Sequence, residues 1–196
     1  MECLSSETFE ALVSRILKCR EFQFTHNALI ADIKILLETL KVTSDQQRPV
    51  LIRAIYKEFF SMVEADLYLI NQFNPYVGYN DKTNLTLKFK KTYRKHAEDF
   101  KKAELHKKYQ NEEFGNFLAL IEKRHHFTHP KGRPSLNVVD QDLANLERVF
   151  EIYRAHINAF MTGVGFELRL RPNATQEDAN RLIARLKTED ARLNPQ

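Results

Sequence analysis

Residues 50–73 read VLIRAIYKEFFSMVEADLYLINQF, and this stretch decides the fold class. Its apolar residues recur every three or four positions, which places them on one face of an α-helix. Pro49 precedes the stretch and suits the first turn of a helix, whereas Pro75 and Gly78 follow it and favour a break. We therefore predict one long core helix with an inward stripe of Ile52, Ile55, Phe59, Val63, Leu67 and Ile70.

The same helical period runs through almost all of the remaining chain. The whole sequence contains five glycines and six prolines, too few for the many turns of an all-β fold. We predict an all-α fold, with Thr25 or Asn27 capping the second helix, Gly163 and Gly165 ending the sixth, and a short extended piece at 166–170. The other predicted helices cover residues 6–17, 25–40, 83–109, 112–128, 140–163 and 177–186.

Composition is that of a soluble globule with a mildly basic surface. The chain has 196 residues, a formal net charge of +4 and a pI of about 9.0, which is compatible with a nucleic-acid partner. No run approaches the roughly 18 apolar residues of a membrane span, and no secretory signal precedes the first helix. Cys3 and Cys19 do not form a disulfide framework. We expect a cytoplasmic protein that does not contact a membrane.

The most informative motif is RHHFTHP at residues 124–130, which holds three of the seven histidines. It lies at the end of the predicted fifth helix, because Pro130 disfavours helix at His129. An imidazole transfers protons near neutral pH, and a guanidinium binds phosphate through paired donors. The motif therefore suits chemistry on a phosphodiester. Lys131 and Arg133 flank it on the following loop, where they are candidates for binding the phosphates of a substrate.

Four residues separate Arg124 from His129, and a glycine-containing turn and a long helix follow them. This pattern resembles the motif of the HEPN superfamily, the higher-eukaryote and prokaryote nucleotide-binding domains. Residues 53–68 are similar to an early core helix of that fold, so the likeness spans roughly residues 50–161. It implies a HEPN-like bundle over residues 49–165, with an N-terminal helical extension at 1–48 and a C-terminal helical appendage at 166–196.

The resemblance also implies an activity. Many members of the superfamily are metal-independent endoribonucleases that dimerise around a shared cleft, often in toxin–antitoxin, antiviral or RNA-processing systems. Carried over, Arg124 and His129 take the catalytic positions, and His125 takes the polar position after the arginine. We expect an RNA-cleaving homodimer without metal or cofactor, with an antitoxin as a possible class of protein partner. The alternative is a non-catalytic helical module that binds a nucleotide or a protein.

Two other interpretations of the same residues stay open. The motif is also explained as cations that complement a helix dipole. Residues four apart on a helix differ in direction by about 40°, and residues five apart by about 140°, so His125 and His129 align better than Arg124 and His129. These two histidines could hold a metal with a third ligand from His126, Glu64 or Asp66.

A second basic stretch, residues 88–96, mixes cations with Phe89 and Tyr93. It is either a surface that tracks RNA or, more commonly for such runs, the solvated face of a helix whose aromatic residues face the core.

The dimer interface is expected on the fifth and sixth helices. The sixth helix carries enough apolar residues for both a core and an interface, and the candidates are Leu143, Val149, Tyr153, Ile157 and Phe160.

Overall fold

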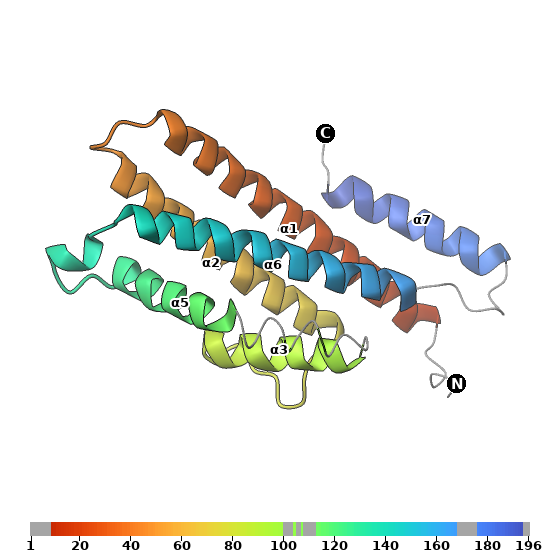
Figure 1. The fold of residues 1–196 in the computed structure, drawn as a ribbon. Helices are drawn as coiled ribbons and strands as arrows, with labels where there is room; N and C mark the ends of the chain where they lie inside the picture. Colours follow the sequence, from red (N-terminus) through yellow and green to blue (C-terminus); the bar gives the residue numbers. More distant parts are fainter. Residues whose placement is uncertain (1–8, 100–103, 105–106, 108–112, 168–175, 194–196) are drawn as a thin grey trace.

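The computed structural model describes residues 9–99, 113–167 and 176–193, together with residues 104 and 107. These residues form six α-helices and one short 3-10 helix, and they contain no strand. The predicted all-α class is confirmed. Figure 1 shows the long helices α1, α2 and α6 running side by side, with the shorter α3 and α5 along one side of α2. No helix of this described part is long and apolar enough to cross a membrane.

Helix α1 is continuous over Phe9–Val42. The prediction of two separate helices was wrong, because Thr25 and Asn27 lie inside α1 and cap nothing. Two physical reasons explain the continuity. No glycine or proline interrupts residues 9–42, and the buried positions continue across the expected break. These buried residues are Val13, Cys19, Phe22, His26, Ile33 and Leu40.

Helix α2 covers Arg48–Phe73 and forms the centre of the bundle. It contacts α1, α3, α5 and α6, and all six residues of the predicted stripe are buried. Pro49 lies in its first turn, and the helix ends where the backbone N–H of Asn74 donates to the carbonyl of Ile70. The predicted core helix is confirmed, with a start two residues earlier than expected. Because α1 packs along α2, the N-terminal segment shares its core.

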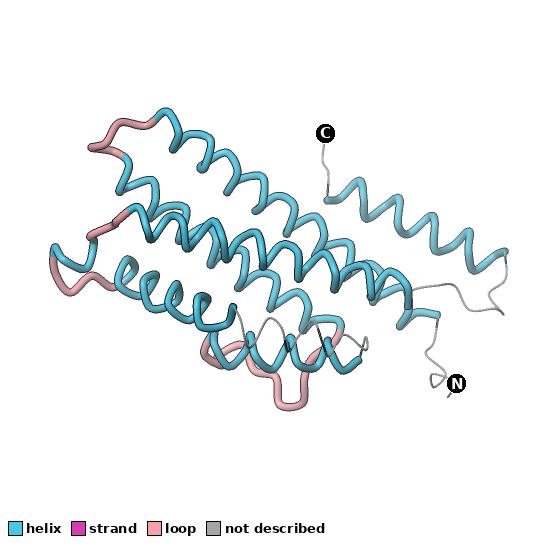
Figure 2. Tube along the Cα trace, in the orientation of Figure 1, coloured by secondary structure: helices cyan, strands magenta, loops and turns pink. Residues whose placement is uncertain are grey.

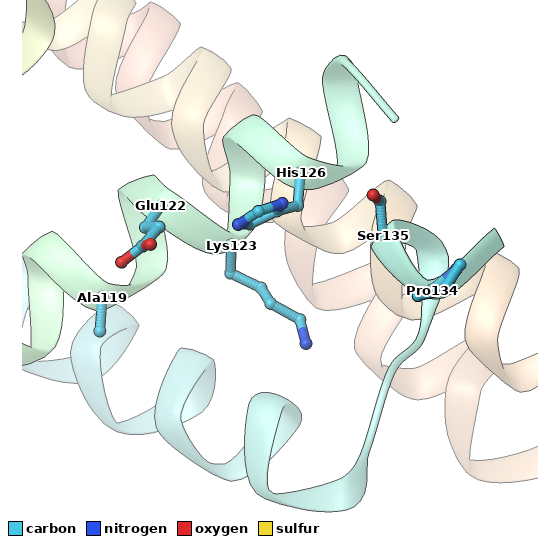
Figure 3. A pocket seen from close by; sticks show the side chains of 6 residues that line it. All are labelled: Ala119, Glu122, Lys123, His126, Pro134 and Ser135. Carbon is cyan, nitrogen blue, oxygen red and sulfur yellow. The ribbon is translucent and has the colours of Figure 1, made fainter. Parts of the chain in front are cut away.

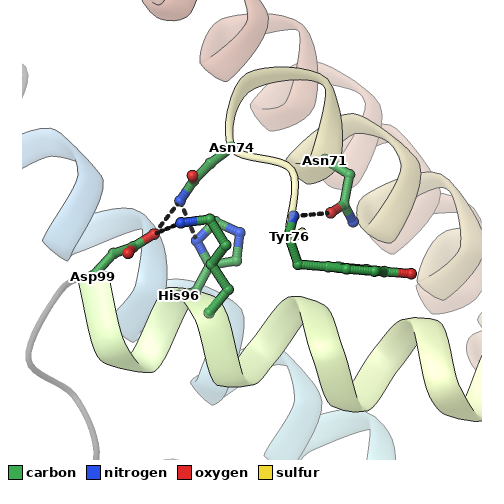
Figure 4. A network of polar contacts seen from close by, with 6 residues as sticks. Asn71, Asn74, Tyr76, His96 and Asp99 are labelled. Carbon is green, nitrogen blue, oxygen red and sulfur yellow. Dashed lines mark hydrogen bonds and ion pairs between the residues drawn. The ribbon is translucent and has the colours of Figure 1, made fainter. Parts of the chain in front are cut away.

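Helices α3 and α5 cover Leu85–Asp99 and Phe114–Thr128. Most of the predicted continuation of the fourth helix to Tyr109 lies outside the described residues. Figure 4 shows the polar contacts that join the turn after α2 to α3. There Asn74 donates through Nδ2 to the Asp99 carboxylate at 2.6 Å and lies 3.5 Å from Nδ1 of His96. The side chain of His96 is buried.

Helix α6 covers Asp140–Glu167 and passes through Gly163 and Gly165, which were expected to end it. A glycine within a helix costs only about 1 kcal/mol relative to alanine and keeps its N–H donor, so it does not stop a helix as proline does. Phe166 is therefore helical rather than extended, and residues 168–170 lie outside the described part. The last helix, α7, covers Gln176–Leu193, is longer than predicted and packs on α1.

The core is rich in aromatic side chains from several helices. Phe59 of α2 contacts the rings of Phe117 on α5 and of Phe150 and Tyr153 on α6. Figure 2 shows the helices lying along one another. The core is therefore built by side chains far apart in the sequence.

The expected interface stripe on α6 belongs to this core. Leu143, Val149, Tyr153 and Ile157 are all buried within a single chain, so they are not exposed for a partner. The side chain of the fifth candidate, Phe160, lies outside those that the structure describes. For these four residues the predicted place in a dimer surface was wrong, since the monomer itself covers them.

Candidate functional site

The 124–130 motif occupies the last turn of α5 and the residues after it. The helix ends at Thr128, as predicted, and His129 leaves the helical conformation with φ −129° and ψ 64°. The backbone N–H of His129 still donates to the carbonyl of His125 at 2.9 Å, and the Thr128 hydroxyl donates to the carbonyl of Arg124 at 3.0 Å. Pro130 cannot continue the helix, so the end of α5 is set by local sequence.

The structure brings His125 and His129 together at this end. Their ring centroids are 5.1 Å apart with an angle of 54° between the ring planes, and both side chains are exposed. The pairing follows from the last backbone hydrogen bond of α5, which keeps residue 129 over residue 125, one turn away. Because an imidazole can give or take a proton, two exposed imidazoles at this spacing can serve one as an acid and the other as a base for a bound ligand.

Arg124 faces α2 instead of the two imidazoles. Its Nη2 lies 2.8 Å from Oε1 of Glu64, and its guanidinium carbon lies 5.5 Å from the centre of the Phe60 ring. The Arg124 side chain is 30% exposed to solvent. A guanidinium has five donors, so the contact through Nη2 leaves others for an anion that approaches from solvent. Glu64 therefore orients Arg124.

The loop after the motif is joined to α2 by one hydrogen bond and is closed by another within itself. It contains the short 3-10 helix η2, Arg133–Leu136, and Arg53 of α2 donates to the carbonyl of Leu136 at 3.0 Å. Both side chains predicted to bind substrate, Lys131 and Arg133, are exposed on this loop. The backbone N–H of Lys131 donates to Oγ of Ser135 at 3.3 Å, which closes the loop upon η2.

A pocket of about 470 Å³ lies between α5 and η2 and was missed from the sequence. Figure 3 shows Lys123 extending towards the space between α5 and η2, with Pro134 and Ser135 on the η2 side. The Lys123 ammonium pairs with Asp142 of α6 at 2.9 Å. No local motif marks this pocket, because one wall comes from α5 and the other from η2 in the loop that follows. The lining residues are Ala119, Glu122, Lys123, His126, Pro134 and Ser135.

The ligands considered for a third metal position have other partners or locations. Glu64 is paired with Arg124, and His126 lines the pocket rather than joining His125. Asp66 lies in the core. Within the part of the chain that the structure describes, no group of three or more His, Cys, Asp or Glu side chains is arranged to hold a metal ion.

Asp66 contacts the imidazole of His26 in the core. The Asp66 Oδ2 atom lies 2.8 Å from Nδ1 of His26 and accepts a 2.7 Å hydrogen bond from the Tyr153 hydroxyl. All three side chains are buried, and burial raises the pKa of the Asp66 carboxyl despite both hydrogen bonds. This network joins α1, α2 and α6 away from the motif, so its role is in the core.

The basic stretch at 88–96 is a solvated helix face in α3. Phe89 and Tyr93 are buried, as the solvated-face interpretation predicts, so they cannot stack on RNA bases. Lys90 and Lys91 are exposed, and their ammonium groups lie over the rings of Phe114 and Tyr76 at 4.6 and 5.4 Å. Cation–π contacts of this kind stabilise the local packing modestly.

Comparisons of the chain with protein-family models, with curated proteins and with solved structures give no match.

Proposed function

We propose that this protein is a metal-independent endoribonuclease of the HEPN type, with its active site at the end of α5. One observation carries the proposal. Two exposed imidazoles, those of His125 and His129, lie 5.1 Å apart in a segment where the preceding residue, Arg124, is held by a carboxylate. Proton transfer and binding of phosphoryl oxygens are the two functions that RNA cleavage needs.

The chemistry uses the nucleophile of the RNA itself. One imidazole takes the proton of the 2′-hydroxyl, and the 2′-oxygen forms a bond to the adjacent phosphorus while the bond from phosphorus to the 5′-oxygen breaks. The other imidazole gives its proton to the departing 5′-oxygen. The products are a 2′,3′-cyclic phosphate and a 5′-hydroxyl. A guanidinium stabilises the negative charge that develops on the phosphoryl oxygens.

A second copy of the chain completes the proposed site. Arg124 faces α2, whereas its neighbour His125 points about 100° further around the helix. A two-fold pairing of α5 helices offers the imidazoles of one chain the guanidinium of the other. Because Leu143, Val149, Tyr153 and Ile157 of α6 are buried, the proposed homodimer uses the exposed face of α5, which includes Leu118 and His125.

The test is cleavage of a 5′-labelled single-stranded RNA by the purified protein in EDTA. We expect cyclic-phosphate and 5′-hydroxyl ends, and loss of cleavage in Arg124→Ala and His129→Ala. The matched control is Arg94→Ala, which removes an exposed arginine of α3. Cleavage that appears only after addition of a divalent metal overturns the metal-independent mechanism. RNA binding without cleavage in any condition favours the non-catalytic module.

A further inference from the structure

The pocket between α5 and η2 lies next to the proposed active site. Successive residues of an α-helix point about 100° apart, so His125 lies between Arg124 on one side and His126 on the other. His126 lines the pocket, and so does Glu122, which precedes His125 by three residues, close to one helical turn. A chain that passes over the two imidazoles therefore reaches the pocket within a short distance.

The pocket has the size for one polar ring system. Its volume of about 470 Å³ falls within the roughly 300–1,000 Å³ of small-molecule sites. The imidazole of His126 and the ring of Pro134 stand on opposite walls and offer faces for stacking. Unpaired RNA bases bind proteins by stacking on side chains such as histidine and by hydrogen bonds to their edges.

The polar groups of the wall favour a neutral ligand over a phosphate. The charge of Lys123 is already balanced by Asp142 at 2.9 Å, and its ammonium lies 5.5 Å from the centre of the Phe127 ring. Glu122, which also lines the pocket, adds a negative charge. An anion would meet that carboxylate and a compensated lysine, whereas a nucleobase brings donors and acceptors without charge.

The hydrogen-bonding groups also match the edges of a base. The Ser135 hydroxyl accepts the backbone N–H of Lys131 and keeps its own proton to donate. A Lys ammonium has three donors, so Lys123 can bind Asp142 and a base carbonyl together. The Glu122 carboxylate accepts from a ring N–H or an exocyclic amino group.

We infer that this pocket binds the base of a single-stranded RNA nucleotide next to the scissile phosphate, and so sets which linkage is cut. The inference rests on the proposed ribonuclease function for the identity of its ligand. It assigns His126 to substrate binding, in contrast to the proton-transfer role of His125 and His129.

The experiment fills the pocket without touching the proposed catalytic residues. Ala119→Leu adds a side chain at an exposed helical position on the pocket wall, and Ala144→Leu makes the same change at an exposed position of α6. Affinity is measured by fluorescence anisotropy with a labelled oligoribonucleotide that carries 2′-O-methyl groups and cannot be cleaved. We expect Ala119→Leu and His126→Ala to bind about tenfold more weakly, in the range for loss of one base–aromatic stack. Ala144→Leu should bind as the natural protein does.

A second measurement identifies what fills the pocket. In a series of uncleavable oligonucleotides with one abasic position each, the natural protein should lose affinity at one position, and Ala119→Leu should lose nothing further there. Equal affinity of Ala119→Leu and the natural protein, with both folded by circular dichroism, overturns the base pocket. An equal loss of affinity at every abasic position also overturns it.

The two proposals fail separately. If RNA is cleaved but Ala119→Leu binds and cleaves as the natural protein does, the ribonuclease stands and the pocket does not hold the base. If RNA is never cleaved but binding depends on Ala119 and on one abasic position, the base pocket stands and the ribonuclease proposal is overturned.

Discussion

Arg124 at the end of α5 is joined to Glu64 of α2 by a 2.8 Å contact between Nη2 and Oε1, although sixty residues separate them in the sequence. The same guanidinium lies over the Phe60 ring, one turn before Glu64 on α2. These two contacts hold the cation of the motif at a defined position on the surface. The two contacts also turn the Arg124 side chain towards α2 and away from the imidazoles of His125 and His129.

Glu64→Gln should reduce RNA cleavage while changing stability little. The glutamine removes the charge that holds Arg124, and misplacement of a catalytic group commonly costs tenfold or more in rate. The pair is partly exposed, so we expect its loss to change the free energy of unfolding by about 1 kcal/mol or less. Steady-state kinetics and urea unfolding check both statements. Glu38→Gln, which breaks the exposed pair with Lys41, is the control. An unchanged kcat in Glu64→Gln contradicts the orienting role.

Mixing an Arg124→Ala chain with a His129→Ala chain should restore part of the cleavage. Because Arg124 and the imidazoles of one chain face different directions, we expect the composite site to take them from two chains. Each variant alone should be inactive. The measurement is the rate of RNA cleavage against the mixing ratio, with light scattering of the active species. An active monomer, or no activity at any ratio, contradicts the shared site.

Stability should fall in mild acid because of His96. Burial lowers the pKa of His96 to about 3, because the opposing effect of the Asp99 charge is smaller than that of burial. In the unfolded chain the pKa of this histidine is near 6.5. The unfolded chain therefore binds a proton below pH 6.5 that the folded protein does not bind. The loss of folding stability from His96 is absent above pH 6.5 and grows as the pH falls towards 3. We expect a loss of about 2 kcal/mol between pH 7 and pH 5 from this residue.

The variant His96→Gln tests this assignment. It removes the titrating group and keeps an acceptor near Asn74, so its free energy of unfolding should depend less on pH than that of the natural protein. Urea unfolding at pH 7 and pH 5 gives the comparison. His125→Gln, at an exposed position, should keep the original pH dependence. A parallel pH dependence in His96→Gln and the natural protein shows that other groups cause the acid sensitivity.

The network in the core should contribute to stability through Tyr153. Tyr153→Phe removes the hydroxyl that donates to Asp66 at 2.7 Å and leaves a buried carboxyl with one partner fewer. Such a loss destabilises proteins by about 1–3 kcal/mol. Urea unfolding measures it, and the double variant with Asp66→Asn should lose less than the sum of the two single variants. If the Tyr153→Phe protein is as stable as the natural one, the hydrogen bond from Tyr153 to Asp66 does not stabilise the core.

Local sequence was sufficient for much of the fold. The stripe in residues 50–73 predicted α2 within two residues, and Pro130 predicted the end of α5. Prediction from local sequence failed where a local preference competed with packing. Thr25 and Asn27 favour helix caps, but buried neighbours such as Phe22 and His26 keep α1 continuous through them. Gly163 and Gly165 weaken α6 without ending it.

The sequence by itself determined that the chain is helical, where α5 stops, and that His125 and His129 lie one turn apart, since these depend on contacts within a few residues. Only the tertiary structure decided that Arg124 faces Glu64, that Asp66 lies with His26 and Tyr153, and that four apolar residues of α6 are inside the monomer. The hydrophobic period shows which side of a helix is buried, but it does not show which other helix covers that side. Charged and polar partners far apart in the sequence meet only after the helices have packed.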